Sequence, residues 1–179
     1  MGRLTERVAV ITGGGSGIGR ATAVRFAEQG AVAVVVDIDA KGAATTVELI
    51  EKDGGTACWF ECDVTDVEAV YSVTKPVIER YGTIDILVTA AATSVGKKIP
   101  DTLPEEWDQV FAVNVKGTYL WMRACIPLMT KGTGSIVALA SQLAISGGLS
   151  NAAYIASKGA IVSLCRTAAN DHASEGIRI

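Results

Sequence analysis

Two side chains in the last third of the sequence could transfer a proton. Tyr154 and Lys158 are four residues apart, so in a helix they lie on one face. A tyrosine with its ordinary pKa of about 10 is a poor base at neutral pH. A neighbouring ammonium group favours the phenolate and lowers that pKa toward the range of general acid–base catalysis. The spacing is common in helices, so its meaning depends on the residues around it.

Ser141 could act on the same substrate atom. It lies 13 residues before Tyr154, at the end of a predicted strand. Open α/β sheets bind their ligands beside the carboxyl ends of the strands. We therefore expect Ser141 and Tyr154 to converge on one carbonyl oxygen.

A glycine-rich segment near the N-terminus has the composition of a phosphate-binding loop. It runs from Thr12 to Gly19, with glycines in a Gly-x-x-x-Gly-x-Gly spacing. Such a loop lets the backbone approach a pyrophosphate, whose charge is met by the N-terminus of the next helix. A structural turn would explain the glycines alone. Their position between a first strand and a first helix favours a dinucleotide site.

Two acidic residues follow later strands at the same edge. Asp37 lies 18 residues beyond Gly19, where a carboxylate accepts hydrogen bonds from a ribose and repels a 2′-phosphate. No Arg or Lys adjoins it, so the sequence predicts NAD rather than NADP. Asp63 and Val64 could bind adenine, by a hydrogen bond and by packing. A solvated Asp37 and an ordinary turn at Asp63 are the alternatives.

Short apolar runs alternate with longer helical patterns, which indicates βαβ units around a parallel sheet. The run of residues 31–36 is apolar throughout, as in a strand buried on both faces. We predict strands at residues 7–11, 31–36, 56–61, 84–88 and 135–139, and helices at residues 13–30, 43–52, 65–81, 102–129 and 151–173.

Two helix starts and one helix break are expected from particular residues. Capping boxes are predicted at Thr65–Glu68 and at Thr102–Glu105. Pro76 should kink the helix that contains it. Gly176–Ile179 looks like the entry to a sixth strand. We therefore expect one doubly wound, Rossmann-type domain over residues 1–179 that is incomplete at its C-terminal end.

The motifs together resemble the short-chain dehydrogenase/reductase family. The matching residues, in order, are Thr12, Gly13, Gly17, Gly19, Asn114, Ser141, Tyr154 and Lys158. The resemblance implies reversible hydride transfer between NAD and an alcohol or ketone. It implies that Tyr154 is the general acid/base and that Lys158 lowers its pKa and holds the nicotinamide ribose. Ser141 would bond the substrate oxygen, and Asn114 would hold a water for proton relay.

The predicted site follows from these residues. The catalytic set is Asn114, Ser141, Tyr154 and Lys158, with no metal ligand. The coenzyme set is Gly13, Ser16, Gly17, Ile18, Gly19, Asp37, Ile38, Asp63, Val64, Ala90, Ala91, Tyr154 and Lys158.

The sequence departs from the family after the fourth strand. The family has Asn-Asn-Ala-Gly where this chain has Thr89-Ala90-Ala91-Ala92. Loss of an Asn amide at Ala90 predicts a looser coenzyme pocket with its chemistry retained. The family's last strands, its Pro-Gly loop and its substrate lid have no counterpart here.

Composition excludes several classes of protein. The chain has 179 residues, 49% of them hydrophobic, and a net charge of −3, which excludes disorder. No Lys/Arg cluster favours nucleic acid, and no apolar span or secretory signal is visible. Four cysteines without metal-ligand spacing and one histidine, His172, predict reduced thiols and a cytoplasmic location.

These observations favour an oxidoreductase acting on a small polyol, sugar or 3-oxoacyl carbonyl. The alternative is a dinucleotide-binding protein without turnover, either regulatory or truncated. An interaction module without a ligand would leave the glycine loop unexplained. Residues 95–102 and 143–150 are expected to border the substrate, and Lys97 and Lys98 either meet an acidic group or are solvated.

The assembly is expected to be a homodimer or homotetramer. The helices predicted at residues 107–129 and 151–173 carry many apolar residues, among them Trp121, Met122 and Ile161. Family members commonly pack these helices across two-fold axes. Packing within one subunit is the alternative explanation.

Overall fold

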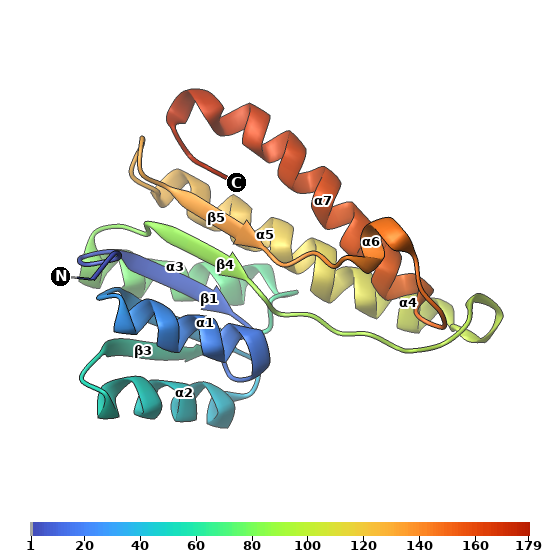
Figure 1. Ribbon diagram of the computed structural model, residues 1–179, viewed down its shortest axis with the longest axis horizontal. Helices are drawn as coiled ribbons and strands as arrows, with labels where there is room; N and C mark the ends of the chain where they lie inside the picture. The colour runs from blue at the N-terminus through green and yellow to red at the C-terminus, as the bar shows by residue number, and fades with distance from the viewer. Residues whose placement is uncertain (1) are drawn as a thin grey trace.

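The structure is a computed structural model that describes residues 2–179. Its centre is a parallel sheet of five strands in the order β3-β2-β1-β4-β5 (Figure 1). The strands are β1 Val8–Thr12, β2 Val32–Asp37, β3 Thr56–Glu61, β4 Ile86–Thr89 and β5 Ser135–Ala138. The order reverses between β1 and β4, which creates the crevice where doubly wound sheets bind ligands. The expected fold class is confirmed.

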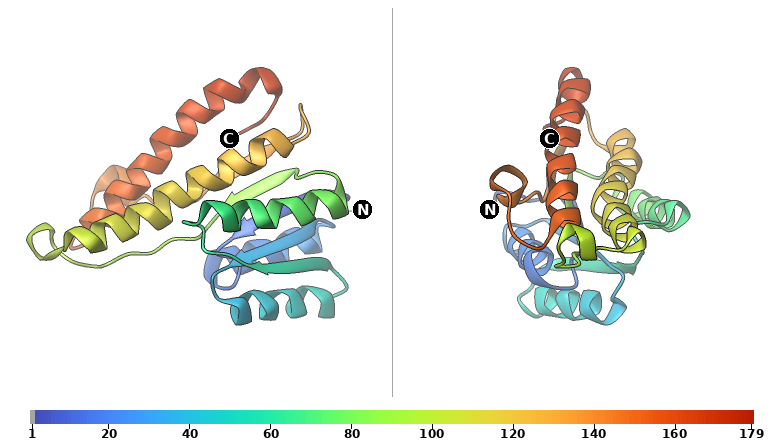
Figure 2. Two further views of the ribbon diagram at one scale, coloured as in Figure 1. Left: turned by 180° about the vertical axis from the view of Figure 1, so that it is seen from behind. Right: turned by 90° about the vertical axis from the view of Figure 1, so that its right-hand side faces the viewer.

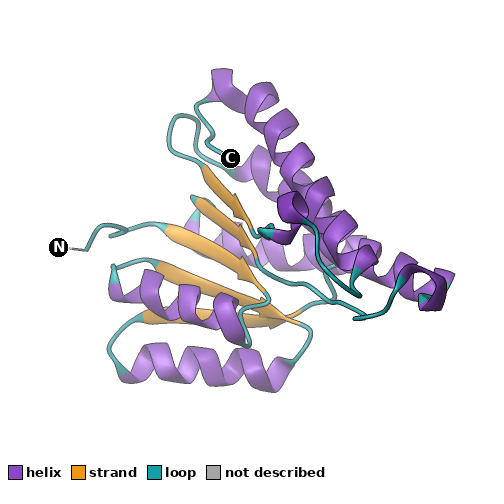
Figure 3. Ribbon diagram, turned by 45° about the vertical axis from the view of Figure 1, so that its right-hand side comes forward, coloured by secondary structure: helices purple, strands orange, loops and turns teal. Residues whose placement is uncertain are grey.

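Helices cover both faces of the sheet (Figures 2 and 3). They are α1 Gly17–Glu28, α2 Ala40–Lys52, α3 Val67–Tyr81, α4 Pro104–Phe111, α5 Gly117–Cys125, α6 Leu143–Ser146 and α7 Ala152–His172. The helices α4 and α7 pack together and extend past the carboxyl ends of the strands, as Figure 1 shows.

The core has two halves because alternate strand residues point to opposite faces. Ala9 and Val35 pack with α1 and α2 on one face. Val10 and Val34 pack with α3 and α5 on the other face. All four are fully buried, which explains why this region of the sequence shows apolar runs and no polar alternation.

Neither predicted capping box forms, because both helices begin one residue later than expected. Asp66, rather than Thr65, caps α3, because its carboxylate accepts the Glu68 N–H at 2.8 Å. At α4, the Glu106 carboxylate accepts the Leu103 N–H at 3.0 Å, so Thr102 and Glu105 form no capping box. Asp binds the free N–H groups of a helix as well as Thr does, so adjacent candidates compete. The helix α3 continues through Pro76 as a single element.

The predicted helix over residues 102–129 is not a uniform α-helix. Between α4 and α5 the chain forms a π-helical turn, Ala112–Lys116, that contains Asn114. A 3-10 turn, Ile126–Leu128, ends the segment. Turns of the π type are rare and are found mainly at functional sites. The short helix α6 was also not predicted.

The last residues of the chain enter the sheet beside β5. Arg178 pairs in parallel with Ser135, and the Ile136 N–H donates to the Arg178 carbonyl at 2.7 Å. This single bridge lies where a sixth strand would pair, and the sixth strand itself stays a prediction.

Candidate active site

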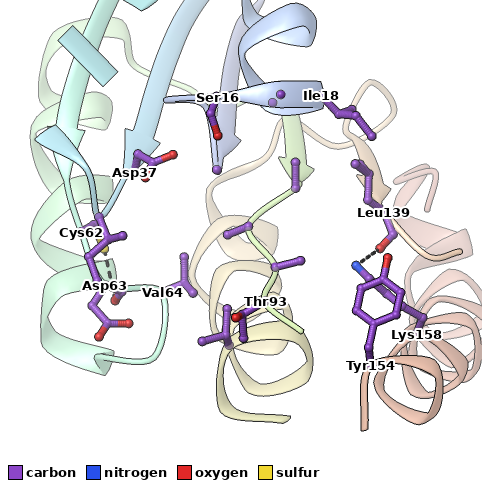
Figure 4. A pocket seen from close by; sticks show the side chains of 18 of the residues that line it. Ser16, Ile18, Asp37, Cys62, Asp63, Val64, Thr93, Leu139, Tyr154 and Lys158 are labelled. Atoms are coloured by element: carbon purple, nitrogen blue, oxygen red, sulfur yellow. Dashed lines mark hydrogen bonds between the residues drawn. The ribbon is translucent and has the colours of Figure 1, made fainter. Parts of the chain in front are cut away.

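A cavity of about 540 Å³ lies at the carboxyl ends of the strands, where β1 and β4 diverge (Figure 4). Every residue of the predicted coenzyme set lines this cavity. Tyr154 and Lys158 line it too, so the structure brings the proton-transfer pair and the glycine loop to one space. The rest of the lining was not predicted from the sequence and consists of Cys62, Ala92, Thr93, Gln109, Val113, Leu139 and Ala140.

The glycine loop is held against its neighbours too tightly for side chains. Gly13 has φ +66°, and a Cβ there would lie 2.7 Å from the Ala91 nitrogen. A Cβ on Gly19 would lie 2.1 Å from the Gly13 carbonyl oxygen. Ser16, the N-cap of α1, makes no side-chain hydrogen bond to the helix end. The N–H groups at the start of α1 therefore face the cavity without a side-chain cap, as an anion site requires.

Asp37 is fixed at the end of β2 by two backbone donors. Its Oδ2 accepts the Gly15 N–H at 2.8 Å, and its Oδ1 accepts the Asp39 N–H at 2.9 Å. A carboxylate so held is oriented for further hydrogen bonds at the cavity wall. The loop is also supported by Arg20, whose guanidinium donates to the Gly15 carbonyl and whose Nε donates to Thr46 Oγ1 at 3.0 Å. Nothing in the glycine motif signalled Arg20.

The third strand contributes a turn and a buried thiol. Asp63 Oδ1 accepts the Thr65 N–H at 2.8 Å, so one carboxylate oxygen serves the local turn. Burial, with the charges of Asp63 and Asp66, raises the pKa of the Cys62 thiol to about 11. Cys62 is therefore a neutral wall of the cavity and not a nucleophile at neutral pH.

Thr12 ties β1 to the segment after β4. Its Oγ1 accepts the N–H groups of Ala90 at 3.2 Å and Ala91 at 3.3 Å. Beside them, the Thr118 hydroxyl of α5 donates to the Asn114 carbonyl at 2.8 Å and lies 3.5 Å from the Thr89 hydroxyl. Thr12 therefore connects β1 to the segment in which the chain lacks the family's Asn side chains. The looser pocket expected from Ala90 stays a prediction.

Tyr154 and Lys158 stand one turn apart on α7. The Lys158 ammonium lies 5.6 Å from the centroid of the Tyr154 ring, and it donates to the Leu139 carbonyl at 2.5 Å (Figure 4). Only 4% of Lys158 is exposed, and burial lowers the pKa of its ammonium. The charged group of Lys158 is therefore held beside the Tyr154 ring at the cavity wall.

Asn114 lies next to the cavity and not in its wall. Its Nδ2 donates to the Thr93 carbonyl at 3.0 Å and to Ser157 Oγ at 2.9 Å, and its Oδ1 accepts the Thr93 N–H at 2.8 Å. Both amide hydrogens are thus used. A water held by Asn114 would have to donate to one of its oxygens, and this role stays a prediction.

Ser141 is placed after β5 but outside the residues that line the cavity. Its Oγ accepts the Leu143 N–H at 3.2 Å, at the start of α6. Its neighbour Ala140 does line the cavity. The expected convergence of Ser141 with Tyr154 stays a prediction.

Lys97 is already paired. Its Nζ lies 2.6 Å from the Glu106 carboxylate, and this contact is the main reason that the pKa of Glu106 is lowered. Lys97 therefore forms an ion pair within the chain while its side chain stays 41% exposed, and a role of Lys97 or Lys98 in meeting an acidic group stays a prediction. Glu106 holds Lys97 beside the N-terminus of α4.

Residues 2–179 show neither a cluster of metal-ligating side chains nor a membrane-spanning helix. Within this range no three His, Cys, Asp or Glu side chains are grouped to hold a metal ion. No helix within the described residues is long and apolar enough to span a bilayer.

The chain is similar to known proteins over nearly all its length. Residues 7–179 match the short chain dehydrogenase family. The chain is 38% identical over 180 residues to the uncharacterized oxidoreductase YxbG of Bacillus subtilis (strain 168), covering 100% of this chain and 66% of that protein. It is 35% identical to the 3beta-hydroxysteroid dehydrogenase of Mediterraneibacter gnavus (strain ATCC 29149), covering 99% and 64%. The chain thus spans about two thirds of the length of these relatives.

A solved structure has the same fold. An NAD+-bound xylitol dehydrogenase superposes with a TM-score of 0.95 at 33% identity, over 99% of this chain and 69% of that one. At this similarity the likeness extends beyond fold to sequence.

Proposed function

Because this chain belongs to the short-chain dehydrogenase family, we propose that it is an oxidoreductase that transfers a hydride between NAD(H) and a small alcohol or ketone. The observation that carries the proposal is the position of Tyr154 and Lys158 in the wall of the cavity that also holds the glycine loop and Asp37. Hydride transfer to a carbonyl needs a proton donor within reach of the same oxygen. Here a single cavity holds both the predicted coenzyme site and the predicted proton donor, Tyr154.

The cavity residues fit a dinucleotide. The glycine loop packs closely against its own neighbours only because Gly13 and Gly19 have no Cβ, and the adjoining start of α1 offers N–H groups to a pyrophosphate. Ile18 and Ile38 are 68% and 66% exposed at this end, so they offer apolar surface to a ligand. When bound, the nicotinamide supplies or accepts the hydride.

Asp37 supports NAD over NADP. Its carboxylate is fixed by Gly15 and Asp39 and can accept hydrogen bonds from ribose hydroxyls. A 2′-phosphate at the same position would place negative charge against it. The one basic side chain bonded to this loop, Arg20, is directed at the carbonyls of Gly15 and Gly42 and at Thr46.

The proton-transfer roles follow from the arrangement on α7. During reduction the Tyr154 phenol gives its proton to the substrate oxygen, and during oxidation the phenolate takes it back. Lys158 stabilises the phenolate and offers N–H donors to the nicotinamide ribose. Ser141 donates to the substrate oxygen. Asn114 contributes by holding the residues around the site, since its amide is fully bonded.

The substrate class is a polyol, sugar or 3-oxoacyl compound, and the name of the xylitol dehydrogenase favours testing a polyol first. We further propose a homodimer or homotetramer formed through α4–α5 and α7, where Tyr119 is 47% exposed. Light scattering that gives a monomer would contradict this assembly. The four free thiols of the described chain support a reducing, cytoplasmic location, and the net charge of −3 supports no nucleic-acid partner.

The replacement Tyr154→Phe tests the function. NADH formation from NAD and xylitol should fall by about 100-fold or more, because general acid–base catalysis contributes at least that much. NADH affinity, measured by fluorescence titration, should stay within about twofold, because the ring remains. Tyr71→Phe, the same chemical change at an exposed residue of α3, should alter neither quantity. Turnover by Tyr154→Phe at the wild-type rate would refute the role.

The second candidate is a dinucleotide-binding protein without turnover. The altered segment Thr89–Ala92 favours it, because this segment lines the cavity beside the coenzyme set. Tight NADH binding by the wild-type protein, with no turnover of polyols, sugars or 3-oxoacyl compounds, would select this candidate.

A further inference from the structure

Ser157 lies between Tyr154 and Lys158 in the sequence. It is fully buried, and it does not line the cavity. Its hydroxyl donates to the Tyr154 carbonyl at 2.7 Å, one turn back along α7. The hydroxyl oxygen of Ser157 also accepts a hydrogen bond from Asn114 Nδ2 at 2.9 Å. A hydroxyl has one proton to give and two lone pairs, so it can make both contacts at once. Alanine could make neither.

Asn114 carries this connection to the opposite wall of the cavity. Its amide bonds both backbone groups of Thr93, the N–H at 2.8 Å and the carbonyl at 3.0 Å. Thr93 follows β4 and lines the cavity together with Ala91 and Ala92. The π-helical turn 112–116 brings Asn114 to this place between α7 and the end of β4.

Both hydrogens of the Asn114 side-chain amide are used in the connection between Thr93 and Ser157. Thr93 and Ser157 take its two N–H bonds, and the Thr93 N–H donates to its oxygen. Asn114 is only 1% exposed, so a lost partner could not be replaced freely by bulk water. A buried network that is fully bonded fixes the positions of its members, whereas a partly bonded one does not.

We propose that Ser157 is a positioning residue that joins the catalytic turn of α7, through Asn114, to the Thr93 wall of the coenzyme cavity. The proposal rests on the function proposed above. By fixing the Tyr154 carbonyl, Ser157 holds the turn that carries Tyr154 and Lys158 at a set distance from the segment after β4. The width of the cavity at its catalytic end then depends on one buried hydroxyl.

The amide of Thr93 provides a direct readout. Its N–H is bonded to the Asn114 oxygen, so its hydrogen-exchange rate reports how firmly the Asn114 amide is held. In Ser157→Ala this exchange should become about tenfold faster, the size expected when one buried hydrogen bond is lost. Two-dimensional NMR of isotope-labelled protein without coenzyme measures it. The amide of Val34, in the fully buried part of β2, reports global opening, and its exchange should change less than that of Thr93.

Matched variants separate this role from a general effect on the helix. Ser163→Ala makes the same chemical change at an exposed position of α7 and should leave Thr93 exchange as in the wild type. Ser157→Thr keeps the hydroxyl and should restore most of the protection. If Ser157→Ala does not fold, Ser157→Cys replaces it, because sulfur nearly fills the site but is a weak acceptor.

NADH titration of the same proteins tests the consequence for the cavity. Ser157→Ala should bind NADH about threefold to tenfold more weakly than Ser163→Ala, because the cavity walls are no longer joined. Equal Thr93 exchange in Ser157→Ala and Ser163→Ala would overturn the proposal. Faster Thr93 exchange without any change in NADH affinity would overturn the positioning role.

The two proposals fail in different ways. A wild-type protein that binds no NADH would refute the coenzyme part of the proposed function, and the exchange of Thr93 would still decide whether Ser157 joins the two walls. A wild-type protein that binds NADH, with Ser157→Ala indistinguishable from Ser163→Ala, would refute the role of Ser157 alone.

Discussion

The two ends of the cavity are built from different parts of the chain. At the glycine-loop end the shape comes from backbone: Gly13 and Gly19 allow close backbone packing, and the Gly15 N–H holds Asp37. At the catalytic end the shape comes from side chains, with Asn114 bonded to residues 21 and 43 positions away. The first end is therefore vulnerable to an added Cβ, and the second to the loss of a single polar group.

The two ends also differ in burial. Ile18 and Ile38 are well exposed beside the glycine loop, whereas Asn114, Ser157 and Lys158 are almost completely buried. Buried polar groups lose more when a partner is removed than exposed groups do. The difference indicates that the coenzyme end can be shaped by contacts made on binding, while the catalytic end is set beforehand by the fold.

The largest effect is expected from a substitution in the glycine loop, which forms the backbone-built end of the cavity. In Gly19→Ala the new Cβ meets the Gly13 carbonyl carbon and oxygen, at 2.6 and 2.1 Å, so the loop must shift. NADH affinity should fall by about 100-fold, because the loop no longer approaches the pyrophosphate closely. Fluorescence titration measures this loss. Gly159→Ala, in a helix with no atom within 4 Å of the new Cβ, is the matched control and should bind NADH normally.

A smaller effect is expected at Asp37, the side chain proposed to select NAD over NADP at the glycine-loop end. Asp37→Ala should bind NADPH about tenfold more tightly and NADH more weakly, because a repelling charge and a ribose acceptor are both removed. Parallel titrations with NADH and NADPH give the preference ratio. Asp53→Ala, an exposed residue at the far end of α2, should keep the wild-type ratio. An unchanged ratio in Asp37→Ala would mean that another residue selects the coenzyme.

The smallest effect is expected at Lys158, the buried charge at the catalytic end of the cavity. Burial lowers the pKa of Lys158, so folding is opposed while this ammonium is charged. Lys158→Met should therefore raise the free energy of unfolding by about 1 kcal/mol near neutral pH. The unfolded chain binds more protons than the folded one between the lowered and the ordinary lysine pKa, so the wild type gains stability across that window.

Urea unfolding at about pH 7 and about pH 10 measures this difference, which should shrink at the higher pH. Lys75→Met, at an exposed position of α3, should show no such pH dependence. A Lys158→Met variant less stable than the wild type at neutral pH would show that the bond to the Leu139 carbonyl outweighs the cost of burial.

The sequence by itself determined the strands, the glycine loop and Asp37. These features depend on neighbours in the chain: apolar runs form buried strands, and closely spaced glycines form the turn before a helix. Helix starts were predicted less well. Asp66 and Thr65 are adjacent and both can cap, so the choice between them depends on the whole first turn.

Only the tertiary structure decided how the catalytic end is built. No local pattern predicts the π-helical turn around Asn114, the bond from Asn114 to Ser157, or the pairing of Lys97 with Glu106. Each depends on which elements pack together, and a hydrogen bond between residues 43 positions apart leaves no periodic trace in the sequence. The chain specifies its backbone-built end locally, and it specifies its catalytic end only through packing.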